Sequence, residues 1–357
     1  MTIEQTIITR LLNNHDPVLN LTLEEMGIKP LVALDDDHLT VNLSAGFPTQ
    51  FLHDAFIPML TTWLSREYSQ YEITITLDPF IKAHETQLAG RGLRGVKNTI
   101  AIASGKGGVG KSTVTVNLAI ALARAGARVG ILDADIYGPS IPLMMGKTAP
   151  VKISGEHYLP VEAHGVQAMS IAYLTEGDQA LIWRGPMLAK SLIQMLDITQ
   201  WDDLDYLLID LPPGTGDIQL TLVQKIPLTG AVVVTTPQQV ATLDAQKALT
   251  MFERTGIHVL GVIENMALHT CSQCGHEEHI FGKGGAQKMC GEKHVELLGQ
   301  LPLDTRIAMQ CDEGIPTAVT GSDEVAMAFI KTALRTAIAL SKRPLNYANK
   351  FPPIVAG

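Results

Sequence analysis

The sequence predicts an α/β protein with a doubly wound, mostly parallel sheet and a small α+β domain before it. Beyond residue 97, short continuous apolar stretches alternate with helical patterns, which is typical of parallel strands covered by helices on both faces. The chain has 357 residues, a length that suggests about two domains. A hydrophobic content of 46% with 18% charged residues excludes a disordered chain.

Residues 1–82 are expected to form the small α+β domain. Apolar residues recur at helical spacing in Ile3–Leu12 and Asp54–Tyr68. His38–Leu43 and Tyr71–Leu77 alternate between polar and apolar residues, as half-buried strands do. This region has no glycine-rich loop and no metal-spaced cluster, so we expect the chemistry to lie further along the chain.

The larger domain is predicted at residues 97–342, after a linker at residues 83–96 that has three glycines and two arginines. Its apolar strands are expected at Asn98–Ala103, Arg128–Leu132, Tyr206–Ile209, Ala231–Thr235, Val259–Ile263 and Glu296–Gly299. Helical patterns are found at Lys111–Ala125 and Glu324–Ser341. Residues 343–357 contain three prolines and are expected to be an irregular tail.

A phosphate-binding loop is predicted between the first strand and the first helix of this domain. Residues 105–112 read GKGGVGKS and fit the pattern G-x-x-x-x-G-K-[ST]. Glycines let several backbone N–H groups point at one anion, and the helix N-terminus favours negative charge. Lys111 is expected to reach the β- and γ-phosphates, and the Ser112 hydroxyl to bind Mg²⁺. The expected nucleotide-binding residues of this loop are Gly105, Lys106, Gly107, Gly108, Val109, Gly110, Lys111, Ser112 and Thr113.

Three aspartates follow the ends of predicted strands. Asp210 ends an apolar strand, as a Walker-B aspartate does, and can hold Mg²⁺ through water. Asp133 and Asp135 follow the neighbouring strand, at the sheet edge where open α/β proteins bind ligands. A carboxylate there could orient the attacking water, and the alternative is that it only caps the next segment.

Lys106 indicates the subclass of phosphate-binding loop. The form GKGGVGKST resembles the deviant Walker-A motif of the MinD/ParA/nitrogenase-iron-protein class. In that class the extra lysine reaches across a dimer to the partner's nucleotide, where a positive charge stabilises the transition state as an arginine finger does. The resemblance therefore implies a homodimer with Lys106 in a catalytic role, and the alternative is a solvated loop lysine.

Cys271 and Cys274 form a C-x-x-C motif that can supply two ligands to a metal centre but cannot close a four-ligand site alone. One interpretation is a one-chain zinc site completed by His276 and His279, although this spacing is tight. Another is a C-x-x-C with no metal. The third is that two chains each donate both cysteines to a shared iron–sulfur cluster or zinc ion. Cys290 and Cys311 are expected to be buried small apolar residues.

The chain resembles the Mrp/ApbC family of P-loop iron–sulfur cluster carriers. The matching motifs are GKGGVGKST (Gly105–Thr113), LDADIYGPS (Leu132–Ser140), WRGPM (Trp183–Met187), DYLLIDLPPGTGD (Asp205–Asp217), TTPQQVATLDAQK (Thr235–Lys247), ENMALHTCSQCGH (Glu264–His276), IFGKGGA (Ile280–Ala286) and LPLDTRIAMQCDEGIP (Leu301–Pro316). The resemblance implies a homodimer that bridges a [4Fe-4S] cluster through Cys271 and Cys274 of each chain. It also implies ATP binding, slow hydrolysis and cluster delivery to apo-proteins, with Asn265 near the adenine and Asp135 near the attacking water.

The N-terminal region resembles the MIP18-like domain of many bacterial members of that family. Asp16 and Pro17 are in place, but the stretch 42–48 lacks the cysteine that this domain often has before a proline. We therefore expect a partner-docking or stabilising module without a role in cluster binding.

The net charge and the targeting patterns reduce the number of function classes that fit the sequence. The net charge of −9 argues against nucleic acid and anionic membranes as partners. The chain begins without a secretory pattern and has no run of about 18 apolar residues, so we expect a cytoplasmic protein. Two alternative functions remain open from the sequence: a MinD/ParA-like positional ATPase, and a zinc-bridged dimer regulated by nucleotide.

Overall fold

The chain divides into two compact units, which are described separately. Unit 1 comprises residues 1–82 with 337–342, and unit 2 comprises residues 83–336 with 343–357. The computed structural model describes residues 2–174, 185–319 and 321–346. Trp183 and Arg184 of the WRGPM motif and residues 347–357 of the expected tail lie outside the described residues.

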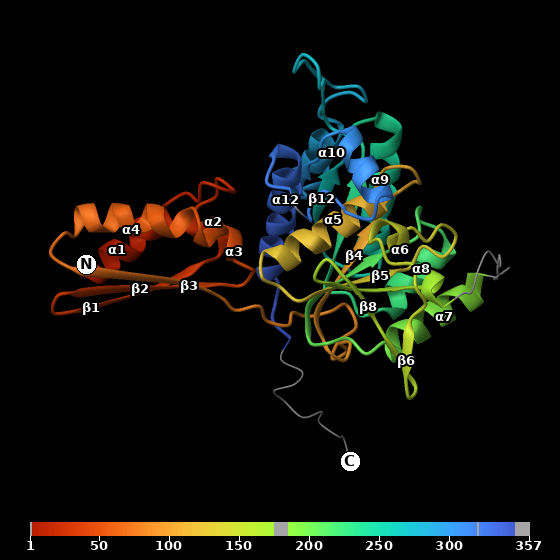
Figure 1. The fold of residues 1–357 in the computed structure, drawn as a ribbon, viewed down its shortest axis with the longest axis horizontal. Coiled ribbons are helices and arrows are strands. Elements are labelled where there is room, and N and C mark those ends of the chain that lie inside the picture. The colour runs from red at the N-terminus through yellow and green to blue at the C-terminus, as the bar shows by residue number, and fades with distance from the viewer. Residues whose placement is uncertain (1, 175–184, 320, 347–357) are drawn as a thin grey trace. The chain divides into compact units, whose positions relative to one another are not determined.

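Unit 1 is a three-stranded sheet with helices packed on one side (Figure 1). Its elements are α1 (Ile3–Leu12), α2 (Leu23–Met26), β1 (Lys29–Asp35), β2 (His38–Ala45), α3 (Gln50–His53), α4 (Phe56–Glu67) and β3 (Glu72–Pro79). The strand order is β1-β2-β3, with β1 antiparallel and β3 parallel to β2. The buried faces of α1 and α4 supply Ile7, Leu11, Leu60 and Leu64, while β2 buries Val41 and Leu43. The predicted α+β character of this region is confirmed.

Unit 2 is built on an eight-stranded sheet with the order β15-β12-β11-β4-β10-β5-β9-β8. The strands are β4 (Val96–Ala103), β5 (Val129–Asp133), β8 (Val161–Ala163), β9 (Val166–Ser170), β10 (Leu204–Asp210), β11 (Gly230–Thr235), β12 (Val259–Glu264) and β15 (Leu297–Gln300). All neighbours are parallel except β8, which runs antiparallel to β9. This order confirms the doubly wound, mostly parallel sheet predicted from the sequence.

Helices cover both faces of this sheet. They are α5 (Lys111–Arg124), α6 (Ile141–Met144), α7 (Gly185–Ile198), α8 (Asp217–Lys225), α9 (Gln239–Arg254), α10 (Gly285–Lys293), α11 (Thr305–Asp312) and α12 (Glu324–Ser341). Buried residues of α7, α8, α9 and α10 form one core with β4, β5, β10 and β11, whereas α5 packs on the sheet through its own buried residues. Smaller elements are η1 (Ile171–Tyr173) and the hairpins β6 (Lys152–Ser154) with β7 (His157–Leu159) and β13 (His269–Thr270) with β14 (Glu277–Glu278).

The segment predicted to be a linker packs on unit 2. The His84 backbone N–H donates to Asn98 Oδ1 at 3.1 Å, and the His84 side chain is buried. The Gln87 amide donates to the carbonyl oxygens of Val223 and Ile226 at 2.8 and 2.7 Å. Leu345 of the expected tail pairs with His84 in an isolated antiparallel bridge. Residues 83–95 therefore form part of the larger unit.

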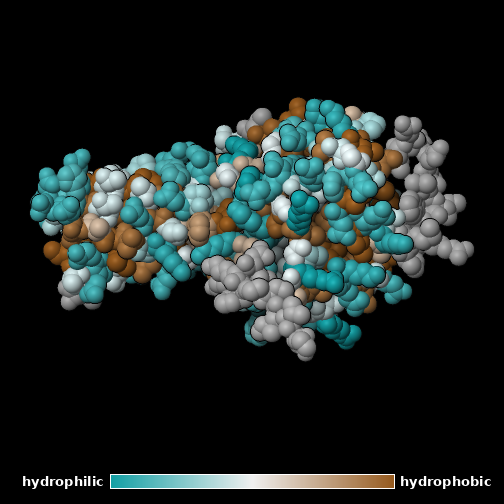
Figure 2. All heavy atoms as spheres, turned by 90° about the horizontal axis from the view of Figure 1, so that it is seen from below, coloured by the Kyte–Doolittle hydropathy of each residue, from teal (hydrophilic) through white to brown (hydrophobic). Residues whose placement is uncertain are grey.

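The surface mixes polar and apolar residues. On the face drawn in Figure 2, hydrophilic side chains are interspersed with hydrophobic ones. Among the helices that the structure describes, none is both long and apolar enough to cross a membrane.

Candidate functional site

The phosphate-binding loop connects β4 to α5 at the carboxyl edge of the large sheet. Gly108 and Gly110 have φ values of +78° and +79°, a left-handed conformation that glycine adopts without steric cost. Gly110 is the N-cap of α5, so the positive end of the helix dipole faces the loop. This backbone is the arrangement that binds phosphate.

Two glycines of the loop, Gly105 and Gly110, lie in close contact with other elements. A Cβ on Gly105 would lie 2.2 Å from the Asp244 carbonyl oxygen in α9. A Cβ on Gly110 would lie 2.4 Å from Asn265 Nδ2. The loop is therefore held between α9 and the residue that follows β12.

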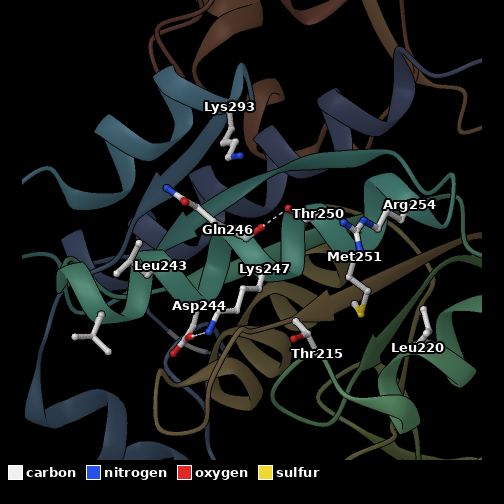
Figure 3. Close-up of a pocket in the computed structure, with 11 residues that line it drawn as sticks. Thr215, Leu220, Leu243, Asp244, Gln246, Lys247, Thr250, Met251, Arg254 and Lys293 are labelled. Carbon is white, nitrogen blue, oxygen red and sulfur yellow. Dashed lines mark hydrogen bonds and ion pairs between the residues drawn. The ribbon is translucent and has the colours of Figure 1, made fainter.

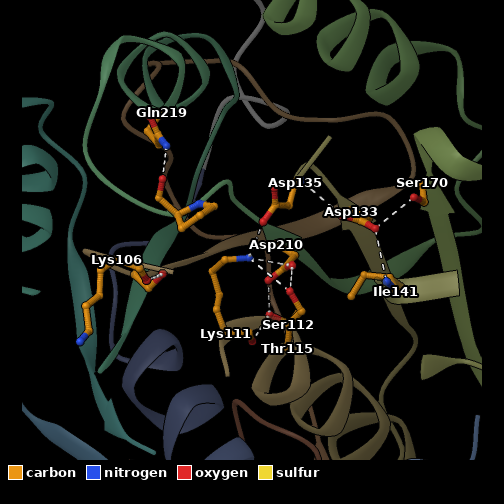
Figure 4. A network of polar contacts seen from close by, with 12 residues as sticks. Lys106, Lys111, Ser112, Thr115, Asp133, Asp135, Ile141, Ser170, Asp210 and Gln219 are labelled. Atoms are coloured by element: carbon orange, nitrogen blue, oxygen red, sulfur yellow. Dashed lines mark hydrogen bonds and ion pairs between the residues drawn. The ribbon is translucent and has the colours of Figure 1, made fainter. Parts of the chain in front are cut away.

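Lys111 and Asp210 lie at the centre of a polar network (Figure 4). The Lys111 ammonium lies 2.8 Å from Asp210 Oδ2, and both side chains are almost fully buried. The Ser112 hydroxyl donates to Asp210 Oδ2 at 2.5 Å, and the Thr115 hydroxyl donates to Asp210 Oδ1 at 2.7 Å. The structure thus brings together the lysine and serine of the loop with the aspartate at the end of β10. The sequence analysis missed Thr115, although it lies four residues after Lys111 on the same face of α5.

Asp133 ends β5 and Asp135 follows it, beside this network. Asp135 Oδ2 lies 3.9 Å from the Lys111 ammonium, and burial raises the pKa of Asp135 above its ordinary value. Asp133 is fully buried, and burial together with the Asp210 charge raises its pKa to about 8. A raised pKa makes the Asp135 carboxylate a better proton acceptor than an ordinary aspartate.

Lys106 points away from the Lys111 ammonium (Figure 4). Its carbonyl oxygen accepts a hydrogen bond from the Ser104 hydroxyl at 2.9 Å, which fixes the backbone while the side chain stays half-buried. Within the described ranges, the Lys106 ammonium pairs with no carboxylate.

The loop encloses a cavity of about 280 Å³. Its wall combines the phosphate-binding loop with the segment after β5 and the start of the loop after β10. The lining residues are Ser104, Lys106, Gly107, Gly108, Val109, Gly110, Lys111, Ser112, Thr113, Asp135, Ser140, Met144 and Pro213. The polar groups near Lys111 that could bind a cation are oxygens of Ser112, Asp135 and Asp210, and this donor set suits Mg²⁺.

A larger cavity of about 860 Å³ lies along α9, outside the loop (Figure 3). Its wall includes Leu243 and Met251 together with Arg254, and Lys247 pairs with Asp244 at 2.8 Å. It contains no residue of the phosphate-binding loop, and the polar network described above lies elsewhere. We therefore place the nucleotide chemistry in the smaller cavity.

Asn265 contacts the phosphate-binding loop directly. Its Nδ2 donates to the Val109 carbonyl oxygen at 2.9 Å, and its backbone N–H donates to Thr235 at the end of β11. The side chain is buried. Asn265 therefore fixes the phosphate-binding loop, and the adenine contact implied by the family resemblance stays a prediction.

Cys271 and Cys274 lie in the turn between β13 and β14. The Cys271 N–H donates to the His276 carbonyl at 2.9 Å, and the Gly275 N–H donates to the Cys271 carbonyl at 2.8 Å. The backbone N–H groups of Gln273 and Cys274 point at the Cys271 sulfur and lower the pKa of that thiol. Cys274 is exposed and Cys271 is half-buried. The turn therefore presents two sulfurs to the surface and favours a thiolate at Cys271.

The histidines beside this turn do not complete a one-chain metal site. In the described part of the chain, no three His, Cys, Asp or Glu side chains come together in a way that could hold a metal ion. The His279 ring bonds to the Ala267 carbonyl at 2.8 Å instead. A single chain therefore offers two thiolates, a set that fits a cluster or soft metal only if another molecule supplies more ligands.

The other two cysteines are buried, as the sequence analysis expects. Burial raises the pKa of Cys290 and of Cys311 to about 11. Neither thiol has the exposed, thiolate-favouring environment of the turn between β13 and β14.

Comparison with known proteins gives consistent matches. A family model described as the NUBPL iron-transfer P-loop NTPase, of the ParA group, matches residues 95–338. The iron-sulfur cluster carrier protein of Salmonella typhimurium is 48% identical over 321 residues, which are 89% of this chain and 87% of that protein. The protein of that name from Deinococcus radiodurans is 41% identical over 96% of this chain and 97% of its own length.

Two solved structures have a similar fold. The nucleotide-binding protein from Archaeoglobus fulgidus, in complex with ADP, matches with a TM-score of 0.55 and 41% identity over 62% of this chain and 87% of that chain. The cell division ATPase MinD of Pyrococcus furiosus matches with a TM-score of 0.50 and 24% identity over 67% of this chain and 97% of that chain. The second match bears on the fold alone.

Proposed function

The chain belongs to the family of NUBPL iron-transfer P-loop NTPases, as its motifs predict, and from that premise we propose that it is an ATP-hydrolysing carrier of [4Fe-4S] clusters. Two copies bind one cluster at their interface and transfer it to apo-proteins in the cytoplasm. The observation that carries the proposal is the turn between β13 and β14, where Cys271 and Cys274 present two sulfurs on the unit that also contains the phosphate-binding loop. Two such turns supply the four thiolates that a [4Fe-4S] cluster requires.

The nucleotide site acts through positioning and charge. The loop amides and the Lys111 ammonium bind the phosphates of ATP, which compete with Asp210 for that ammonium. Ser112 and Asp210 would hold Mg²⁺, which neutralises charge on the phosphates when bound. Asp135 orients the attacking water and accepts its proton.

The second protomer completes the active site in this proposal. The Lys106 ammonium, which points away from Lys111, reaches the nucleotide bound to the partner subunit. A positive charge supplied in this way stabilises the transition state of phosphoryl transfer. Hydrolysis therefore depends on the same dimer that binds the cluster, which couples the two events.

Unit 1 has a supporting part in this proposal. Among the described residues it contains no cysteine and no group of side chains that could hold a metal ion. We assign it a partner-docking or stabilising role. The domain limits predicted from the sequence, 1–82, 97–342 and 343–357, differ from the two units, because residues 83–95 join unit 2 and residues 337–342 join unit 1.

Cluster transfer tests the function directly. The anaerobically loaded protein is mixed with an apo-enzyme whose activity needs a [4Fe-4S] cluster, with and without Mg-ATP. We expect the wild type to restore that activity and the Cys271→Ala/Cys274→Ala variant to restore none. A loaded wild type that restores nothing would contradict the carrier function.

Two assays separate the alternatives. Zinc without iron in anaerobically purified protein would favour the zinc-bridged dimer. Strong ATP-dependent binding to anionic vesicles or duplex DNA would favour a positional ATPase, which the net charge of −9 disfavours.

A further inference from the structure

Asp133 lies behind the nucleotide site and is not part of it. It ends β5, where it pairs in register with Asp210 of β10 on one side and Ser170 of β9 on the other. Its side chain is 1% exposed. A buried carboxylate is costly unless hydrogen bonds satisfy its oxygens, so its partners indicate what it does.

The Asp133 carboxyl group forms hydrogen bonds with both ends of one loop (Figure 4). Oδ1 accepts a hydrogen bond from the Asp135 N–H at 3.2 Å, and Oδ2 accepts one from the Ile141 N–H at 3.4 Å. The Ser170 hydroxyl donates to Oδ2 at 3.0 Å and so fixes the carboxylate from the neighbouring strand. Ile141 is the first residue of α6, whose N-cap Ser140 makes no side-chain capping bond. The carboxylate thus closes the loop and caps the helix that follows it.

This loop forms one wall of the nucleotide cavity. Asp135 and Ser140 line the cavity, as does Met144 in α6. Between the two bonded ends, Tyr137 is 68% exposed, and the half-buried Ile136 is the residue that packs against the hydrophobic core. The position of Asp135 relative to Lys111 therefore depends on the two hydrogen bonds at the ends of the loop together with the packing of Ile136.

We propose that Asp133, fixed by Ser170, is a positioning residue for nucleotide hydrolysis: it holds the loop 135–141 so that the Asp135 carboxylate faces the reacting phosphate. This inference rests on the proposed function, because it assigns to Asp133 a role in the hydrolysis that Asp135 assists. Asp133 does not touch the nucleotide in this account. Its loss affects the rate of the chemical step and leaves ground-state binding by the phosphate-binding loop in place.

Asp133→Asn is the principal variant, because the amide has the shape of the carboxyl group but only one acceptor oxygen. We expect kcat for ATP to fall at least about tenfold while KM stays within about twofold. Ser170→Ala removes one of the three donors and is expected to lower kcat about fivefold, since one hydrogen bond contributes about 1 kcal/mol. Ser170→Ala also keeps the proposal testable if Asp133→Asn does not fold.

Asp205→Asn is the matched control. Asp205 is also a buried aspartate of the same sheet, and it pairs with Lys97 at 2.7 Å and accepts the Arg128 N–H at 2.9 Å. It lies near the start of β10, at the opposite end of the strand from Asp210, and it does not line the nucleotide cavity. We expect Asp205→Asn to lower stability but to leave kcat within about twofold of the wild type.

Hydrogen exchange measured by NMR or mass spectrometry supplies a readout that does not depend on activity. Asp133→Asn is expected to accelerate exchange of the Asp135 and Ile141 amides, and Asp205→Asn to leave them unchanged. Unchanged exchange in Asp133→Asn, or an equal loss of kcat in both variants, would overturn the positioning role. A wild type that hydrolyses no ATP would instead overturn the proposed function, and the exchange data would still decide the role of Asp133.

Discussion

The Asn265 amide donates a hydrogen bond to the Val109 carbonyl oxygen at 2.9 Å, which joins the phosphate-binding loop to the segment that leads into the cysteine turn. From Asn265 the chain reaches Cys271 in six residues. The intervening backbone is tethered, because Ala267 donates to the Leu301 carbonyl at 2.9 Å and Leu268 accepts from the Leu303 N–H at 2.8 Å. A change in the loop on nucleotide binding has a short, hydrogen-bonded route to the cysteines.

Asn265→Ala should weaken nucleotide binding about tenfold and reduce the effect of ATP on cluster transfer. The variant leaves the buried Val109 carbonyl without this donor, a loss of about 1–3 kcal/mol. Titration with a fluorescent ATP analogue measures the affinity. Asn42→Ala, the same chemical change on β2 of unit 1, is the control and should leave affinity within about twofold; equal losses in both variants would refute the linkage.

Lys111→Ala and Lys106→Ala should separate binding from hydrolysis. Lys111 lies among the oxygens of Asp210, Asp135 and Ser112, so its removal should lower nucleotide affinity about 100-fold or more. Lys106 points away from that cluster, so its removal should lower kcat about 1,000-fold while affinity changes little. Equilibrium binding and steady-state turnover check this pair, and hydrolysis that survives in Lys111→Ala would place the site elsewhere.

Gly105→Ala should destabilise unit 2 by about 1–3 kcal/mol, because the new Cβ would lie 2.2 Å from the Asp244 carbonyl oxygen. Gly291→Ala in α10 is the matched control. A Cβ there meets no atom within 4 Å, and alanine favours a helix over glycine by about 0.5–1 kcal/mol. Urea unfolding of both variants gives the comparison; equal stability of the two would show that α9 does not press on the loop.

The Cys271 thiol should react with iodoacetamide at a lower pH than an ordinary cysteine. Backbone N–H groups at its sulfur lower its pKa, so the thiolate is present below the usual range and the alkylation midpoint shifts down. Peptide mapping after timed alkylation resolves each cysteine. In the native protein Cys290 and Cys311, with pKa values of about 11, should react slowly, and in urea all four should converge. A native Cys271 midpoint equal to that in urea would contradict the structure of the turn.

Local sequence patterns predicted the central strands of the fold and the phosphate-binding loop of the site. The alternation of apolar runs and helices predicted the strands around β4 and β10, and the glycine spacing predicted the phosphate-binding loop. The edge strands β1 and β8 were not predicted, and β1 contains Pro30. The strand β9, which lies between β5 and β8 in the sheet, was not predicted either. Edge strands bury little surface, so their apolar pattern is weak.

Local sequence patterns could not predict the contacts between segments that lie far apart in the chain. The hydrogen bond from the Ser170 hydroxyl to Asp133 joins parts of the chain that the parallel pairing of β5 and β9 brings together. The bond between Asn265 and Val109 spans 156 residues. Sequence spacing suggested that aspartates gather at the carboxyl edge of the large sheet. It could not show which of them contact Lys111 and which only support the loop 135–141.

The measurement that tests the central claim most directly is native mass spectrometry of the protein after anaerobic reconstitution with iron and sulfide. The account predicts a dimer with the added mass of one [4Fe-4S] cluster, and a Cys271→Ala/Cys274→Ala variant that binds no cluster. A monomer that holds a complete cluster, or a double variant that retains the same cluster, would contradict a site shared between two cysteine turns.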